Sequence, residues 1–170
     1  MKILLALIGF VAIVVGIAAA GFFFLGFFNV AATEADPDVV NWALVKVRQA
    51  SIARHAKDTP PGSLDDAATV RAGARAYATY GCVVCHGGPG AEWAKLSEGL
   101  NPGPPDLKEV APERSPAELF YVIRNGIKMT GMPSFKLAGV PDAEIWSIVA
   151  FVKKLPSVSD ADFKAWQAQP

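Results

Sequence analysis

The stretch Cys82-Val83-Val84-Cys85-His86 has the spacing that attaches a c-type haem to a protein chain. In a helical turn, two cysteines separated by two residues project their sulfur atoms to one side, where they match the two vinyl groups of a haem. The histidine that follows is then placed beneath the iron. We therefore predict that Cys82 and Cys85 hold a haem covalently and that His86 is an axial ligand of its iron.

Two other interpretations of the cysteine pair are weaker. The chain has no further cysteine, and its only histidines are His55 and His86. A thioredoxin-type dithiol would require a βαβ pattern, which the sequence lacks. A zinc site would require additional cysteines, or more than the one further histidine at position 55. One motif of this kind predicts one covalent haem c per chain.

The other side of the iron requires a second donor or an open site, and low-spin electron carriers usually use a methionine sulfur there. Met132 is favoured over Met129, because the proline in Gly131-Met132-Pro133 keeps the segment extended and stiffens it. We expect Met129 to be a packing residue. His55 is the rival ligand, but it precedes a Pro-Pro break, and we assign it to the surface or to the propionate side of the haem.

A proline-rich loop is the predicted support of the ligating histidine. Such a histidine usually donates its second ring N–H to a backbone carbonyl or a carboxylate. Gly103-Pro104-Pro105-Asp106-Leu107 can hold a carbonyl in one place at low entropic cost. A rigid turn without this role would have the same composition.

The first residues of the chain are strongly apolar. No charged or strongly polar residue occurs from Ile3 to Phe28, a run of 26 residues. As a helix it would span about 39 Å, which exceeds the hydrocarbon core of about 30 Å. A cleaved signal peptide is the alternative, but its apolar region has only ~7–15 residues. We therefore predict an uncleaved anchor, and Lys2 favours a cytoplasmic N-terminus.

The rest of the chain has helical patterns and no strand pattern. Apolar residues at helical spacing predict helices over 37–57, 65–80, 115–125 and 141–155, the third with a capping box formed by Ser115 and Glu118. The expected organisation is an anchor over 1–28, a membrane-proximal helix and linker over 29–63, a haem domain over 64–156 and a tail over 157–170.

Charge and composition exclude some functions. The chain has 16 basic and 16 acidic residues, and without Lys2 the balance is 15 against 16. No basic face stands out, so we expect no nucleic-acid partner. No acid/base pair is placed for peroxide chemistry, which disfavours a peroxidase.

From Asp65 to Pro156 the sequence resembles the class I cytochromes c. Gly73 and Tyr77 are similar to the glycine and aromatic residue of the family's first helix, which packs against the C-terminal helix. The haem motif, Pro105-Asp106-Leu107 and the string from Gly126 to Phe135 follow in the family's order. That last string is similar to the distal-ligand loop of single-haem domains in membrane-bound oxidase and dehydrogenase subunits.

The resemblance implies an all-α fold in which three to five helices surround one haem with one edge exposed. Here a single transmembrane helix precedes that fold. The resemblance also implies that Met132 binds the iron. The predicted haem-site residues are Cys82, Cys85, His86, Pro105 and Met132.

We predict an electron carrier and not an enzyme. The chain would transfer single electrons in a respiratory or related redox chain, held by one membrane span with its haem domain on the periplasmic side of a bacterial inner membrane. Its partners would be the membrane and redox proteins. The alternatives are a haem subunit of a larger membrane oxidoreductase complex and, less favoured, an open-site haem sensor or peroxidase in which Met132 does not bind the iron.

Overall fold

The computed structural model describes residues 1–168, and the regular structure in this range is helical. An isolated bridge between Gly88 and Ala91 is the one exception among these residues. The predicted all-α class is therefore confirmed. The chain divides into two compact units, one comprising Met1–Ala35 and the other beginning at Asp36.

The first unit consists of helix α1 (Lys2–Phe24) and the residues that follow it. At ~1.5 Å per residue its 23 residues extend for about 35 Å, long and apolar enough to cross a membrane. Signal sequences share these two properties. The helix ends four residues before the expected Phe28, and Gly26 adopts a left-handed φ of 68° just beyond it.

The second unit contains seven α-helices and two 3-10 helices within the described residues. In chain order they are α2 (Asp38–His55), α3 (Ala67–Thr79), α4 (Cys82–His86), η1 (Lys95–Gly99), α5 (Leu107–Val110), α6 (Pro116–Asn125), α7 (Asp142–Lys154), η2 (Leu155–Ser157) and α8 (Asp160–Gln167).

Helices α3 and α7 form the centre of this unit. Gly73 lies where they meet, and a Cβ atom added to it would lie 1.8 Å from the carbonyl oxygen of Ser147. One turn later, the ring of Tyr77 packs against that of Phe151, with centroids 5.2 Å apart. The expected packing of the glycine–aromatic pair against the last predicted helix is confirmed.

Helix α6 begins as its sequence predicts. Ser115 Oγ accepts a hydrogen bond from the backbone N–H of Glu118, and the Glu118 carboxylate accepts one from the backbone N–H of Ser115. The helix packs on α7 through Phe120 and Trp146, whose rings stack with centroids 4.1 Å apart. By contrast, α2 begins with Pro37 at its N-cap and has no side-chain cap.

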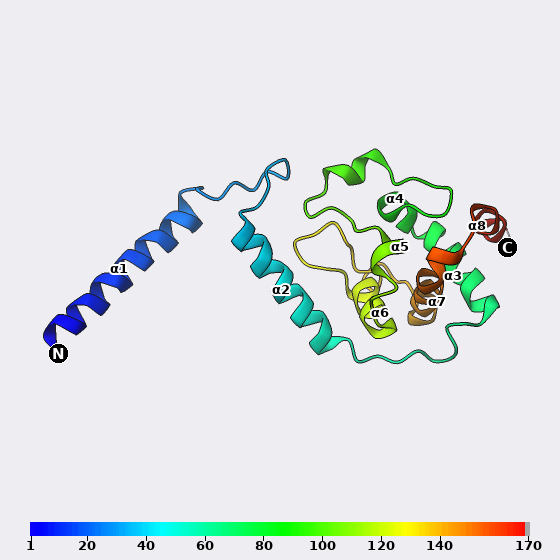
Figure 1. Ribbon diagram of the computed structural model, residues 1–170, viewed down its shortest axis with the longest axis horizontal. Coiled ribbons are helices and arrows are strands. Elements are labelled where there is room, and N and C mark those ends of the chain that lie inside the picture. Colours follow the sequence, from blue (N-terminus) through cyan, green and yellow to red (C-terminus); the bar gives the residue numbers. More distant parts are fainter. Residues whose placement is uncertain (169–170) are drawn as a thin grey trace. The chain divides into compact units, whose positions relative to one another are not determined.

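The segment after residue 156 is more than the tail that we expected. Ser159 caps helix α8 by accepting a hydrogen bond from Asp162 N. Phe163 is only 2% exposed, and its ring stacks on Phe151 with centroids 5.3 Å apart. Figure 1 shows α8 beside α3 near the C-terminus. Helix α8 therefore extends the hydrophobic core that α3 and α7 form.

Candidate haem site

The two cysteines lie on the one-turn helix α4. Gly81 has a left-handed φ of 78°, which lets the chain leave α3 and begin α4 at once. Cys82 and Cys85 are free thiols. Burial raises the pKa of Cys82 to about 12, and its side chain packs against the core. Two free thiols on one helical turn are the donors that thioether attachment of a haem requires.

A hydrogen bond fixes the ring of His86, which lies at the end of α4. Its Nδ1 lies 2.9 Å from the carbonyl oxygen of Pro105. With Nδ1 as the donor of this bond, Nε2 is left as the metal-binding atom. Burial lowers the pKa of His86, which favours the neutral imidazole that binds metals.

The carbonyl of Pro105 is itself held by the start of α5. Asp106 caps this helix, and its Oδ1 accepts a hydrogen bond from Lys108 N at 2.7 Å. The helix was not predicted, although Asp106 is a residue type that commonly caps a helix. The carbonyl of Pro105, which accepts the hydrogen bond from His86, therefore lies next to a turn that has its own internal hydrogen bond.

A tyrosine fixes the backbone directly after His86. The hydroxyl of Tyr77 donates to the carbonyl oxygen of Gly87 at 2.8 Å. Burial raises the pKa of Tyr77, so this hydroxyl stays protonated and remains a donor. Gly87 has a φ of 64°, and a Cβ there would lie 3.0 Å from Ala91 O, so the turn requires glycine. Sequence reasoning identified Tyr77 only as a packing residue.

Helix α8 covers the next residue. A Cβ added to Gly88 would lie 3.0 Å from Cε1 of Phe163. Gly90 is equally close to Asp160, at 3.0 Å from its Cβ. The segment that follows the predicted iron ligand is thus held by α3 on one side and by α8 on another. No sequence prediction connected α8 with this site.

The two internal methionines differ in their surroundings. Met132 is half-buried and packs against the core, whereas Met129 is 89% exposed with a φ of 60°. The backbone around Met132 is ordered by short-range bonds: its carbonyl accepts from Ile127 N at 3.2 Å, and its N–H donates to Thr130 Oγ1 at 3.1 Å. These surroundings suit Met132 better than Met129 as an iron ligand.

Backbone hydrogen bonds attach the loop of Met132 to α6. Phe135 N donates to Ile123 O at 3.3 Å, and Lys136 N donates to Arg124 O at 3.0 Å. Gly126 ends the helix with a φ of 68°, and a Cβ there would lie 2.6 Å from the carbonyl carbon of Pro133. The return of the loop past α6 therefore requires glycine at position 126.

The loop of Met132 also touches the long loop that follows α4. A Cβ added to Gly131 would lie 2.7 Å from Cδ1 of Leu100. Leu100 comes from the segment between the haem motif and Pro105, so the loop that follows α4 lies against the loop of Met132. The structure thus joins the haem motif to the proline-rich loop through His86 and Pro105, and the loop after α4 to the methionine loop through Leu100 and Gly131.

His55 lies outside this arrangement. It is exposed at the end of α2, its Nδ1 is 2.8 Å from the carbonyl oxygen of Ser51, and its ring stacks on Tyr121 with centroids 6.1 Å apart. Among residues 1–168 there is no group of three or more histidine, cysteine, aspartate or glutamate side chains that could hold a metal ion. These features are consistent with a surface role for His55, which remains a prediction.

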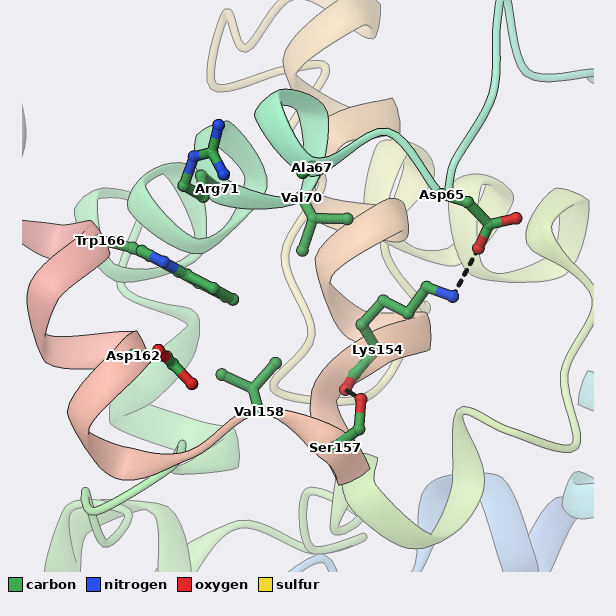
Figure 2. A pocket seen from close by; sticks show the side chains of 9 residues that line it. All are labelled: Asp65, Ala67, Val70, Arg71, Lys154, Ser157, Val158, Asp162 and Trp166. Atoms are coloured by element: carbon green, nitrogen blue, oxygen red, sulfur yellow. Dashed lines mark hydrogen bonds and ion pairs between the residues drawn. The ribbon is translucent and has the colours of Figure 1, made fainter.

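A surface pocket of about 240 Å³ lies away from the predicted haem residues. Figure 2 shows Trp166 of α8 and Val70 of α3 along its wall, and the ion pair between Lys154 and Asp65 at one end. None of the five predicted haem-site residues lines it. We therefore assign it no part in holding the haem.

The comparisons with known proteins agree with the motif. A family model described as "Cytochrome C oxidase, cbb3-type, subunit III" matches residues 68–152, half of the chain. The match runs from the start of α3 to near the end of α7 and includes the haem motif, Pro105 and Met132. Neither the curated proteins nor the solved structures contain a match.

Proposed function

Because the chain belongs to the cytochrome family of the cbb3-type cytochrome c oxidase subunit III, we propose that it is a membrane-anchored electron carrier with one haem c. The family implies covalently bound haem c and electron transfer. The number of haems, the ligands and the membrane anchor are our own proposals.

The observation that carries this proposal is the fixed orientation of His86. Its Nδ1 lies 2.9 Å from Pro105 O, so Nε2 is the atom that would bind iron. Cys82 and Cys85 would form the thioether bonds, and the sulfur of Met132 would bind the opposite side. A haem held in this way supplies a one-electron iron couple whose potential depends on the axial ligands and on burial.

The chain's own residues would orient the ligands and limit the access of water. Pro105 holds the imidazole ring, and Tyr77 holds the backbone at Gly87. Phe163 covers Gly88. No step requires a proton donor or a nucleophile, which is in keeping with a carrier.

Helix α1 supports membrane attachment. It is long and apolar enough to cross a bilayer, and Lys2 lies at its N-terminal end. We propose that it stays attached to the chain and that the second unit faces the periplasm of a bacterial inner membrane, where it would exchange electrons in a respiratory or related chain.

The second candidate is a haem subunit of a larger membrane oxidoreductase complex. The description of the matching family, which names an oxidase subunit, favours it. Purification in mild detergent distinguishes the two. A carrier elutes alone, whereas a subunit elutes together with other chains.

Denaturing electrophoresis with a haem stain tests the attachment. We expect a stained band for the native protein, loss of the stain after replacement of both cysteines by serine, and an unchanged band for Met129→Ala. A redox titration of the native protein should fit one electron. The proposal is contradicted if acid-acetone removes all colour from the native chain.

Membrane retention tests the anchor separately. The full-length protein should stay in the membrane fraction after a carbonate wash, because an apolar helix that spans the bilayer is not released at high pH. Recovery of a soluble chain that begins near Thr33 would show that the segment is a cleaved signal instead.

A further inference from the structure

Helix α2 exposes four large apolar side chains, of which Leu44 is 50% exposed and the other three share one broad face. Val39, Trp42 and Val47 are 69%, 61% and 68% exposed. Their spacing of three and eight residues places them on one face of the helix, together with Lys46 and Arg54. A tryptophan and two valines at this exposure form a largely uncovered surface within the described structure.

The remaining side of α2 holds the helix against α6. Arg48 and Ile52 are partly buried, and the ring of His55 stacks on Tyr121 of α6. The apolar face is therefore not needed for this packing. It is free to contact something outside the chain.

Positive charge is concentrated in the same helix. Residues 38–57 contain four basic residues and one acidic residue, whereas residues 58–170 contain eleven basic and thirteen acidic residues. Helix α2 itself has three basic residues and one acidic residue, a net charge of +2, and Lys57 just after it raises the charge of the segment 38–57 to +3. Residues 58–170 have a net charge of about −2 at neutral pH, when carboxylates are ionised. A cationic helix with an exposed tryptophan complements an anionic, partly apolar surface.

The length of the linker limits how far α2 can lie from the end of α1. Thirteen residues separate Phe24 from Asp38. Fully extended, they reach at most about 45 Å. With α1 in a bilayer, the membrane surface is the anionic surface that α2 meets at the highest local concentration.

We propose that α2 binds the surface of the membrane that α1 crosses, with Val39, Trp42 and Val47 among the lipid chains and Lys46 and Arg54 against anionic phospholipid headgroups. This inference rests on the proposed anchoring by α1. Tryptophan is enriched at the membrane interface, and lysine and arginine side chains on the same face can lay their apolar stems along the lipid and extend their charged ends to the headgroups. Anionic phospholipid is the occupant that matches both properties.

This binding would orient the electron-transfer domain. Helix α6 packs on α2, and the backbone of α6 carries the loop of Met132 through Ile123 and Arg124. Binding of α2 to the membrane would therefore fix the position of this loop with respect to the lipid surface. Electron exchange with a membrane-embedded partner would then occur in a restricted orientation.

Spin labelling of the full-length haem-loaded protein tests the proposal. The native cysteines are consumed as thioethers, so a single introduced cysteine is the only free thiol. We would label Trp42→Cys on α2, Ala165→Cys on the exposed side of α8 and Ile13→Cys on α1, in nanodiscs of phosphatidylglycerol and phosphatidylcholine with the haem reduced. Power saturation with oxygen and with a water-soluble nickel chelate reports whether each label lies in lipid or in water, and the haem spectrum reports folding.

The expected result is a several-fold higher oxygen-to-chelate accessibility ratio at position 42 than at position 165, with position 13 higher still. Each basic residue at an anionic surface is worth about fivefold in binding. Lys46→Gln with Arg54→Gln, or pure phosphatidylcholine, should therefore lower the ratio at position 42 and leave the ratio at position 13 unchanged.

The failures are distinguishable. A ratio at position 42 equal to that at position 165, with position 13 in lipid, overturns the binding of α2 and leaves the anchor intact. A label at position 13 that reports water overturns the anchor and this inference with it. If the ratio at position 42 is high but does not change with the lipid charge or with the two glutamine substitutions, the role of anionic headgroups is overturned.

Discussion

The two sides of the candidate haem site are held in different ways. We call the side of His86 proximal and the side of Met132, the other predicted ligand, distal. On the proximal side, buried side chains from separate elements fix the backbone around His86: Tyr77 binds Gly87 O and Phe163 covers Gly88. On the distal side, Met132 lies on a loop attached to α6 mainly by backbone hydrogen bonds. Changes on the proximal side should therefore cost folding stability, whereas changes on the distal side should mainly alter iron coordination.

The largest loss of stability is expected where α3 crosses α7, because α3 also carries Tyr77 of the proximal side. In Gly73→Ala the new methyl group would meet the backbone of Ser147 at 1.8 Å. Overpacking usually costs ~1–3 kcal/mol, and backbone cannot rotate away, so we expect about 4 kcal/mol. Denaturant unfolding of the haem-loaded protein measures this loss. Gly99→Ala is the control, because no atom lies within 4 Å of its added Cβ, and an equal effect for both would contradict the expectation.

Removing the aromatic ring of α8 comes next. Phe163→Ala deletes a ring that is 2% exposed and contacts Phe151 and Gly88, and such a cavity costs about 3 kcal/mol. Lys164→Ala, on the exposed side of the same helix, should change the free energy of unfolding very little. If both variants unfold at the same denaturant concentration, α8 does not support the proximal side.

The hydrogen bond of Tyr77 should have a smaller effect. Tyr77→Phe leaves the carbonyl of Gly87 without its buried donor, at a cost of about 1–2 kcal/mol. Tyr80→Phe is the matched control, since the hydroxyl of Tyr80 donates to the exposed Glu144. Chemical denaturation of the two variants should show the greater loss for Tyr77→Phe, and a greater loss for Tyr80→Phe would count against the proximal assignment.

The smallest effect on stability is expected at the exposed ion pair between α6 and α7. Arg124 Nε lies 2.8 Å from Asp142 Oδ1, and this hydrogen bond holds the pKa of the Asp142 carboxyl below its usual value. Because the folded-state pKa is lowered, the pair stabilises the fold above the unfolded-state pKa of about 3.9, and this contribution is lost as the pH falls through the folded-state pKa.

Thermal unfolding as a function of pH measures that contribution. The melting temperature of the native protein should slightly exceed that of Asp142→Asn at neutral pH, and the difference should vanish in acid. A difference that persists below both pKa values would show that the carboxylate charge is not its cause. The effect should remain well below that of the buried proximal groups, because exposed ion pairs contribute little.

Local signals explain most of what the sequence predicted. The start of α6 follows from Ser115, Pro116 and Glu118, which lie within one turn of one another. The meeting of α3 and α7 was implied by family resemblance at Gly73 and Tyr77. Helix α8 was missed because its apolar pattern is only eight residues long, although Ser159 and Asp162 form a cap that could have indicated it.

The contacts that hold the candidate site could not be predicted in the same way. The bond from Tyr77 to Gly87 O depends on the left-handed backbone of Gly81 and Gly87, which turns the chain between them. The contact between Leu100 and Gly131 joins two loops without any periodic pattern. Such contacts arise from the tertiary fold, so composition and spacing do not predict them.

The central claim is that Met132 is the sixth ligand of the iron. One comparison of spectra tests this claim most directly. We predict that Met132→Ala removes the long-wavelength sulfur-to-iron absorption band of the oxidised protein, lowers the reduction potential and lets carbon monoxide or cyanide bind, whereas Met129→Ala and His55→Ala keep the native spectrum. A low-spin spectrum that survives Met132→Ala and is lost in His55→Ala would contradict the account and indicate two histidine ligands. Absence of the band from the native protein would equally contradict it, because an open site fits a sensor or a peroxidase and not a carrier.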